Sequence, residues 1–476
     1  MNHTHLSSRV SPGAPVRETT AALQALIDET ASTGGVVSVD PGEWEITTIH
    51  LRGGMTLRLE RGAVLKAHPD IEAYEHLARG HNKDRQPYHL LYADGCEGLT
   101  VEGDGVIDGQ GPAFWDPPMG DRSQGAVGLF HRHKGKRVSP LMEVRNSRDV
   151  VLRGFTLRNS PGWTLHTYLC DRVRIQGVTV DNHLFGPNTD GFDINGCRDV
   201  WVSDCELRCG DDAIILKATD DARDCERIVV TNCILESNCA ALGLGAETAF
   251  AIRDVAFSNC VVRAALRMIQ MEMWEAGTIE NVAISNITGR TMSQVPLERP
   301  IYLDIQSHGR KDPGLGTLRN IVISNFTAET RGRIVLTAKD GACIENVTLR
   351  DIHLRYPEIE DPRLTVNRMR SSQMSNDSPL SRDVRSAIVA DNVRGLGLYN
   401  VVTTWPSPDA DPAEKPDGQF PGIHGTLPMH AIWARRVRDA VVDCPGLAPS
   451  QPDVEALVQT ESDIEVRALG ARGPSS

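Results

Sequence analysis

An internal repeat limits the fold of this chain more than any other feature of its sequence. Ten segments of nine residues each combine a short alternating strand, a Gly, Asn or Asp turn and a second short strand. The turns fall at Gly103, Gly154, Gly177, Asp204, Asn232, Asn259, Asn286, Asn325, Asp351 and Asn400. Where coils follow one another without interruption, the turns are 23 to 28 residues apart. This period, with β-branched strands and no paired helices, predicts an all-β solenoid and excludes ankyrin and tetratricopeptide arrays.

The residue after each turn is apolar in every coil but the first. These residues are Phe155, Val178, Cys205, Cys233, Cys260, Ile287, Phe326, Ile352 and Val401. Because stacked coils lie about 4.8 Å apart, we expect them to form one interior column. The three cysteines are therefore interpreted as small core residues rather than metal ligands or disulfide partners. The total of 11 cysteines is odd and includes no CxxC pair, which favours free thiols in a reducing compartment.

The composition narrows the possible partners. Apolar residues make up 40% and charged residues 24% of the 476 positions, so a sizeable core can form. A net charge of −13 argues against nucleic acid and anionic membranes as main partners. No apolar run is long enough for a transmembrane helix, and residues 1–20 lack the apolar stretch of a secretory signal. We expect a cytoplasmic protein, or a secreted or periplasmic one if a signal has been removed; its oligomeric state is not predicted.

The repeat defines the expected domain organisation. A polar N-terminal tail over residues 1–18 precedes a single domain over residues 19–470. The domain begins with a helix that Thr19 or Thr20 caps and Gly34 ends, and this helix covers the exposed strand edges of the first coil. Four excursions are rich in Pro, Gly, Ser and charge and are predicted as loops, which often build the binding site of a solenoid. They lie near residues 112–140, 290–316, 355–392 and 404–428.

Carboxylates gather on two neighbouring coils. Asp190 lies in the segment 186–194, and Asp211 and Asp212 lie in the segment 209–217, so that Asp211 follows Asp190 by 21 positions. This spacing is slightly less than one coil, so the three acids are expected on one face. Acids this close cannot all ionise, and at least one pKa must rise. A protonated acid beside an ionised base is the arrangement that glycosidic hydrolysis needs.

Two other interpretations of these acids stay open from spacing alone. Asp and Asn side chains in solenoid turns often only satisfy backbone amides. A calcium site built from carboxylates is the second alternative. Asp193 alternates with apolar neighbours and is interpreted as structural.

The two acidic segments resemble those of a known family. Asn188-Thr189-Asp190, followed by Gly210-Asp211-Asp212, is similar to the motifs of glycoside hydrolase family 28, the polygalacturonase-like enzymes. The runs at residues 34–35, 106–111 and 159–166 add to this resemblance, which covers roughly residues 15–355. It implies a right-handed parallel β-helix of the pectin-lyase type and a carbohydrate substrate, and it implies no cofactor and no metal.

The resemblance also implies catalytic roles. Asp211 would be the general acid that protonates the leaving oxygen, while Asp190 and Asp212 would hold and deprotonate the attacking water. The reaction would be inverting hydrolysis, for which acid and base usually stand roughly 6.5–9.5 Å apart.

The sequence departs from the family pattern at two points. Ala240 replaces a His thought to assist the acid, although a shift of one residue would place Cys239 there. In the Arg-Ile-Lys motif of the polygalacturonases, Arg267 remains and Ile269 replaces the Lys. Losing one of two cations weakens the case for galacturonate. We therefore expect a pectin-related or another acidic or deoxy-sugar-containing oligosaccharide or polysaccharide, with exo action as a further hypothesis.

Seven residues are candidates for substrate binding. Lys217 either contacts substrate or neutralises the acids, and His166 either binds substrate or forms a hydrogen bond within a turn. The basic stretch from His131 to Arg137 is either a solvated loop or a lid over an anionic sugar. The candidates are Asn188, His166, Lys217, Arg267, Glu272, Trp274 and Tyr302.

Two rival functions remain at this stage. A parallel β-helix lyase or epimerase would need a Lys or Arg base and often calcium. A non-catalytic carbohydrate-binding solenoid would fit the missing His and Lys, but the retained acids count against it because buried like charges are costly.

Overall fold

The structure is a computed structural model, and its chain forms two compact units. It describes residues 2–77, 84–118, 131–291, 298–306, 314–357, 380, 384–406 and 429–471. The first unit comprises the described residues up to Ser237, and the second comprises those from Asn238 onward.

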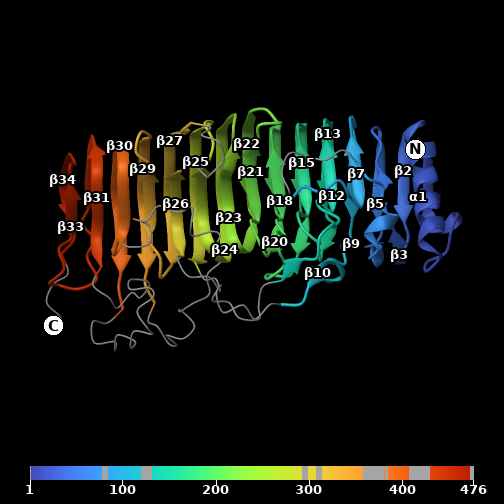
Figure 1. The fold of residues 1–476 in the computed structure, drawn as a ribbon, viewed down its shortest axis with the longest axis horizontal. Helices are drawn as coiled ribbons and strands as arrows, with labels where there is room; N and C mark the ends of the chain where they lie inside the picture. The colour runs from blue at the N-terminus through green and yellow to red at the C-terminus, as the bar shows by residue number, and fades with distance from the viewer. Residues whose placement is uncertain are drawn as a thin grey trace. The chain divides into compact units, whose positions relative to one another are not determined.

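The first unit consists of short strands with few helices (Figure 1). Its helical segments are η1 (Leu6–Ser8), α1 (Val16–Ala31), η2 (Ile71–Ala73) and η3 (Gly111–Phe114). Its strands up to the first excursion are β1 (Asn2–His5), β2 (Gly35–Val39), β3 (Gly42–Ile46), β4 (Ile49–His50), β5 (Met55–Leu59), β6 (Ala63–Ala67), β7 (Leu91–Asp94), β8 (Thr100–Gly103), β9 (Val106–Asp108) and β10 (Trp115–Asp116). The following strands are β11 (Arg132–His133), β12 (Met142–Arg145), β13 (Arg148–Arg153), β14 (Thr156–Arg158), β15 (Leu165–Tyr168), β16 (Asp171–Gln176), β17 (Thr179–Asp181), β18 (Phe192–Asn195), β19 (Arg198–Ser203), β20 (Glu206–Cys209), β21 (Ile214–Ala218) and β22 (Cys225–Thr231).

These strands pair in parallel from coil to coil and form three sheets. One sheet runs β2, β5, β8, β13, β16, β19 and β22, and another runs β3, β6, β9, β14, β17 and β20. The third, which we call the site sheet, runs β4, β7, β12, β15, β18 and β21. Each strand therefore lies beside the equivalent strand of the next coil, as expected for a parallel β-helix.

Helix α1 lies against β2 and β3 and buries Leu23, Leu26 and Ile27 (Figure 1). The predicted capping helix is thus confirmed, but it begins earlier than Thr19, because Val16 follows Pro15 directly into the first turn. The segment predicted as a polar tail carries β1, which pairs in parallel with β2. Polar side chains pair across this edge, so a tail prediction based on polarity missed the strand.

The second unit continues the same pattern with longer strands that bend through their turns (Figure 1). Strand β23 (Ile234–Thr248) begins in the first unit and ends in the second. The remaining strands are β24 (Ala251–Met273), β25 (Thr278–Thr291), β26 (Arg299–Ile305), β27 (Thr317–Glu329), β28 (Ile334–Ala338), β29 (Ile344–Arg355), β30 (Ser386–Thr404), β31 (His430–Arg438), β32 (Ala440–Cys444), β33 (Leu457–Thr460) and β34 (Ile464–Leu469). Parallel ladders join β25, β27, β29 and β30 in register.

The predicted turn column is confirmed in both units. All ten turn residues have a positive φ, the left-handed conformation that Gly, Asn and Asp adopt most readily. The side chains also stack, since Asn286 Nδ2 donates to Asn259 Oδ1 at 2.9 Å and Asn325 Nδ2 donates to Asn286 Oδ1 at 3.1 Å. The nine apolar residues that follow the turns are all buried, as the interior column requires.

The excursions are less regular than the coils but are not simply loops. The range 112–140 contains the antiparallel pair β10–β11, and the loop predicted over 290–316 is wrong where β26 forms. Residues 119–130, 292–297 and 307–313 of these two ranges, and most of 355–392 and 404–428, lie outside the described residues. Pro and charge at both ends of β26 concealed a strand whose seven residues are all buried.

All 11 cysteines lie in the described part of the chain and are free thiols, ten of them buried. The prediction of core cysteines is therefore confirmed for Cys205, Cys233 and Cys260. Within the described residues, no helix has both the length and the apolar character needed to cross a membrane.

Candidate active site

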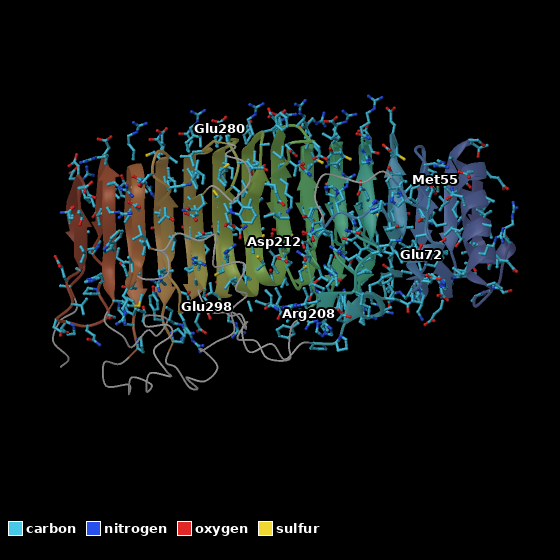
Figure 2. The ribbon with its side chains drawn as sticks, viewed as in Figure 1. Met55, Glu72, Arg208, Asp212, Glu280 and Glu298 are labelled. Atoms are coloured by element: carbon cyan, nitrogen blue, oxygen red, sulfur yellow. The ribbon has the colours of Figure 1, made fainter. Side chains whose placement is uncertain are left out.

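The loops before β18 and β21 bring the three predicted acids together. These strands are neighbours in the site sheet, and Gly191 N–H donates to the carbonyl of Asp212 at 2.8 Å. Asp190 therefore comes just before one strand, and Asp211 and Asp212 come just before the next; Figure 2 labels Asp212. Gly210 keeps the two loops in contact, because a Cβ there would lie 2.4 Å from Thr189 Oγ1.

The acids are crowded as well as buried. One carboxylate oxygen of Asp211 lies within 4.8 Å of one of Asp212. Burial raises the pKa of Asp190 well above its usual value, and the charges of Asp193, Asp211 and Asp212 raise it further. The chain therefore holds a protonated carboxyl beside other carboxylates. Asp190, the carboxyl whose pKa is raised, is one that the family resemblance assigns to the base side of the reaction.

Asp190 also presents an open acceptor position. It is 3% exposed, and its Oδ1 has no hydrogen-bond partner among the residues that the structure describes. A buried carboxyl oxygen without a partner is rare in a folded protein and marks a place for a water or ligand.

Lys217 lies beside this acidic group. Its Nζ is 3.6 Å from Asp193 Oδ1 and lies over the Trp163 ring, 4.8 Å from the ring centre. The charge of Lys217 also opposes the raised pKa of Asp190. Of the two roles predicted for Lys217, the geometry supports neutralisation of the acids.

His166 belongs to a buried network rather than to a turn. It is completely buried in β15, and its Nδ1 is 3.5 Å from Glu143 Oε2 in β12. Burial lowers the pKa of His166 to about 4, so the ring is neutral at neutral pH. Glu143 in turn receives hydrogen bonds from Arg85 Nε at 3.1 and 3.0 Å, and interactions with Arg85 and the two nearby histidines hold its pKa well below its usual value despite burial.

The sequence did not reveal this network because its members are far apart in the chain. Glu143, His166 and Asp193 are register partners on three successive strands, so they form one polar row on the site sheet. The only signal was the polar residue in the middle of each strand, which alternation alone assigns to solvent. His89 also joins the row, with Nε2 3.6 Å from Glu143 Oε2.

Asn188 contacts the predicted general acid directly. Its Nδ2 donates to Asp211 Oδ2 at 3.4 Å, and its Oδ1 is 3.4 Å from His133 Nε2. The prediction that Asn188 belongs to the site is consistent with this position. His133 was predicted only as a member of the basic stretch from His131 to Arg137.

The second unit holds the other predicted binding residues as a compact group. Arg267 Nη1 donates to Gln270 Oε1 at 2.6 Å and to Glu272 Oε2 at 3.2 Å. Trp274 Nε1 donates to Glu272 Oε1 at 2.9 Å. The two carboxylate oxygens of Glu272 therefore bridge a buried cation and a half-buried indole ring.

Tyr302 is completely buried within this group. The Arg267 and Arg299 guanidinium groups lie over its ring at 4.8 and 4.7 Å, and its hydroxyl donates to Asp304 at 2.7 Å. The ring has no exposed face on which a sugar could stack. Ala240, which stands for the family His, is also fully buried, in β23.

The acids of the first unit fit a calcium ion poorly. Calcium binding needs six to eight oxygen ligands from ionised or carbonyl groups. Here the ammonium of Lys217 already lies beside Asp193 and supplies a positive charge to the acidic group. The site therefore favours acid–base chemistry over cation binding.

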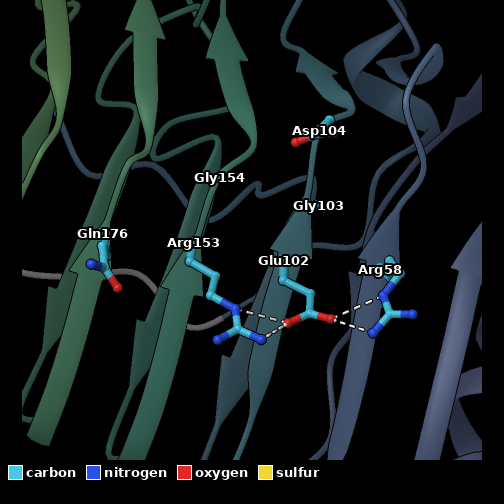
Figure 3. A pocket seen from close by; sticks show the side chains of 7 residues that line it. All are labelled: Arg58, Glu102, Gly103, Asp104, Arg153, Gly154 and Gln176. Carbon is cyan, nitrogen blue, oxygen red and sulfur yellow. Dashed lines mark hydrogen bonds and ion pairs between the residues drawn. The ribbon is translucent and has the colours of Figure 1, made fainter.

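A hollow of about 470 Å³ in the first unit is open to solvent (Figure 3). Arg58 and Arg153 flank Glu102, with Arg58 Nη2 2.6 Å from Oε1 and Arg153 Nε 2.9 Å from Oε2. Partial burial alone would raise the pKa of Glu102, but these hydrogen bonds hold it below its usual value. The residues form a coil-to-coil ladder that joins β5, β8 and β13.

Comparisons with known proteins identify the family to which this chain belongs. The model of the glycosyl hydrolases family 28 matches residues 47–374, and the chain belongs to this family. Among its relatives, a probable polygalacturonase from Vitis vinifera is 28% identical over 297 residues, which is 57% of this chain and 58% of that protein. An exopolygalacturonase from Zea mays is 30% identical over 118 residues, 25% of this chain and 27% of that protein. The chain thus spans little more than half the length of the first of these relatives.

Solved structures show the fold. A family 28 exopolygalacturonase from Yersinia enterocolitica aligns with a TM-score of 0.70 at 17% identity, over 99% of this chain and 79% of that one. An exopolygalacturonase from Thermotoga maritima aligns with a TM-score of 0.63 at 19% identity, over 85% of this chain and 92% of that one. The fold is a right-handed parallel β-helix, as the sequence predicted.

Proposed function

We propose that this chain is a glycosidase that hydrolyses a pectin-related oligosaccharide or polysaccharide. The observation that carries the proposal is the grouping of Asp190, Asp211 and Asp212 on two adjacent loops, with the pKa of Asp190 raised. Such a group supplies a proton donor and a proton acceptor at the same pH. Membership of family 28 supports the same conclusion.

In the proposed reaction, Asp211 gives its proton to the glycosidic oxygen as the bond from that oxygen to the anomeric carbon breaks. Water attacks the anomeric carbon and loses a proton to the pair Asp190 and Asp212. Because the acids interact strongly, their proton belongs to the group as a whole. We propose that the proton rests on Asp190 in the free chain and passes to Asp211 when substrate is bound.

Inversion of the anomeric configuration is part of the proposal. This part of the proposal rests on Asp190 and Asp212, two carboxyl groups that can hold and deprotonate one attacking water. The spacing of Asp211 and Asp212, within 4.8 Å, is shorter than the roughly 6.5–9.5 Å typical of inverting enzymes and does not itself support inversion. Proton NMR of the first product formed decides: the inverted anomer supports the proposal, and the retained anomer contradicts it.

The substrate is proposed to carry fewer carboxylates than polygalacturonate, with neutral or deoxy sugars among its residues. Arg267 is already paired with Glu272 and Gln270 inside the second unit, and Ile269 offers no second cation. A group whose charge is compensated internally gains less from a uronate carboxylate. Exo action is a further proposal, and a ladder of mid-sized products from a polymer would contradict it.

The test is a screen for reducing-end release from purified polygalacturonate, rhamnogalacturonan and bacterial oligosaccharides. Release of reducing ends without the ultraviolet absorbance of an unsaturated uronate supports hydrolysis. Absorbance from a new double bond would instead indicate a lyase. Sugar binding without any release would favour a non-catalytic solenoid.

A further inference from the structure

The antiparallel pair β10–β11 lies outside the parallel sheets and is anchored by several contacts; Figure 1 labels β10. Trp115 Nε1 donates to the carbonyl of Pro161 at 2.9 Å. The Trp115 ring fills space that two glycines leave open, because a Cβ at Gly111 would lie 2.7 Å from the ring and one at Gly186 would lie 2.8 Å from it. The pair is therefore fixed against the loop that carries Asn188.

The second strand of the pair is held in the same way. His131 N–H donates to the carbonyl of Phe185 at 3.0 Å, and the His131 ring packs edge-on to His183 at 5.2 Å. Trp115 and His133 are directly opposite each other in the antiparallel pair. Opposite residues of such a pair point to the same face, so the anchor at Trp115 also sets the direction of His133.

His133 reaches the acids through Asn188. The His133 ring nitrogen Nε2 is 3.4 Å from Asn188 Oδ1, and Asn188 Nδ2 is 3.4 Å from Asp211 Oδ2. An amide side chain can present its oxygen or its nitrogen to a neighbour, and the two orientations differ in hydrogen-bond sense. If the oxygen of Asn188 faces an N–H of His133, the nitrogen must face Asp211.

Resting on the proposed hydrolysis, we propose that His133 is a positioning residue for the general acid. Its Nε2–H holds the Asn188 amide so that Nδ2 donates to Asp211 Oδ2. Oδ2 is then occupied as an acceptor, and the proton that Asp211 transfers is carried on Oδ1. The excursion between β9 and β12 thus supplies a contact that fixes which oxygen of Asp211 delivers the proton.

Replacements that mimic one ring nitrogen at a time test this role. The amide nitrogen of Gln stands near the place of His Nε2, whereas the shorter Asn reaches only the place of Nδ1. His133→Ala and His133→Asn should each lower kcat about tenfold with KM changed less than about twofold, because one orienting hydrogen bond is lost. His133→Gln should recover most of kcat. The control Asp116→Asn changes the neighbouring residue pair of the same two strands and should match the wild type.

Three results of this series would overturn the positioning role. The first is a wild-type kcat in His133→Ala. The second is a kcat in His133→Gln as low as in His133→Ala, which would indicate that the ring only fills space. A change confined to KM would likewise contradict it. Melting temperatures of all variants separate these outcomes from loss of folding.

A second experiment does not depend on activity. If the wild type releases no sugar from any substrate, only the proposed function is contradicted, and this experiment still tests the role of His133. Long-range ¹H–¹⁵N spectra of protein labelled in histidine report the tautomer of His133, whose signal is assigned by its loss in His133→Gln. The inference predicts a ring protonated at Nε2 whose Nε2 resonance shifts in Asn188→Ala. A ring protonated only at Nδ1, or a resonance unaffected by Asn188→Ala, would refute it.

Discussion

Arg267 and Glu272 form a buried ion pair in the second unit, with Nη1 3.2 Å from Oε2. The pair cancels the charge of the one cation that remains from the family motif. Glu272 also accepts the indole N–H of Trp274, so its carboxylate is fixed from both sides. The proposed substrate preference rests on this ion pair.

The first prediction concerns Glu272→Gln. Removing the charge of Glu272 breaks its ion pair with Arg267, so the guanidinium gains affinity for a substrate carboxylate. We expect kcat/KM for uronate-containing oligosaccharides to rise about fivefold or more relative to neutral ones, as charge-assisted hydrogen bonds allow. Stability should fall by about 3–5 kcal/mol because one partner of a buried pair is lost.

A matched control for Glu272→Gln is available in the same unit. Glu280, which Figure 2 labels, forms an ion pair with the exposed Arg319, and the distance from Arg319 Nη2 to Glu280 Oε2 is 2.6 Å. Glu280→Gln should leave substrate preference unchanged and cost less than about 1 kcal/mol. An unchanged preference in Glu272→Gln, measured with the same oligosaccharides, would remove Arg267 from substrate binding.

The second prediction concerns the pH dependence of stability and Asp190→Asn. The pKa of Asp190 is raised above its ordinary value of 3.8, so the folded chain keeps a proton that the unfolded chain has lost. The stability from this group is fully present below about pH 3.8 and is lost as pH rises through the folded-state pKa. Asp190→Asn should therefore raise the melting temperature at neutral pH, with a smaller gain near pH 4, while abolishing turnover.

The opposite effect on the melting temperature is expected for a carboxylate in β19 of the same unit. Asp199 accepts hydrogen bonds from Arg227 at 2.6 and 3.1 Å, and these bonds lower its pKa. Asp199→Asn should lower the melting temperature slightly at neutral pH and leave activity intact. Thermal unfolding from pH 4 to pH 8 measures both variants, and a destabilised Asp190→Asn would contradict the buried proton.

The third prediction concerns the polar row of the site sheet. Glu143→Gln leaves Arg85 buried with an uncompensated charge, and we expect a loss of about 3–5 kcal/mol in the free energy of unfolding. His166→Gln should have a different signature. The folded-state pKa of His166 is lowered from 6.5 to about 4, so its contribution is fully present above pH 6.5 and is lost as pH falls towards 4.

Denaturant unfolding at several pH values distinguishes these two variants. His166→Gln should weaken the loss of stability between pH 6.5 and pH 4, while Glu143→Gln should destabilise at all these values. As a control, Glu465→Gln removes an exposed ion pair with Arg467 and should change little. A pH profile of His166→Gln identical to that of the wild type would show that the ring titrates normally.

The fold was largely predictable because the repeat acts on every coil. A left-handed turn followed by a buried residue recurs from Gly154 to Asn400, and stacking makes each coil repeat the packing of the last. The strand β26 and the N-terminal strand β1 escaped prediction. Both contain polar residues whose burial depends on neighbours in other coils, which local alternation does not report.

The site was predictable only in part for the same reason. The loops at Asp190 and Asp211 carry a local motif, and the structure brings them together. The row through Glu143 and the contact of His133 with Asn188 join segments 23 to 55 residues apart. Tyr302 illustrates the reverse error, because its aromatic character indicated a sugar contact while Arg267 and Arg299 enclose its ring.

The most direct test of the account compares the wild type with Asp211→Asn on the oligosaccharide that the reducing-end screen identifies. If Asp211 is the general acid, turnover should fall about 10²- to 10⁴-fold with substrate binding retained and the melting temperature close to that of the wild type. Unchanged turnover in a folded Asp211→Asn would remove Asp211 from the mechanism and contradict the assignment of the acidic loops as a hydrolytic site.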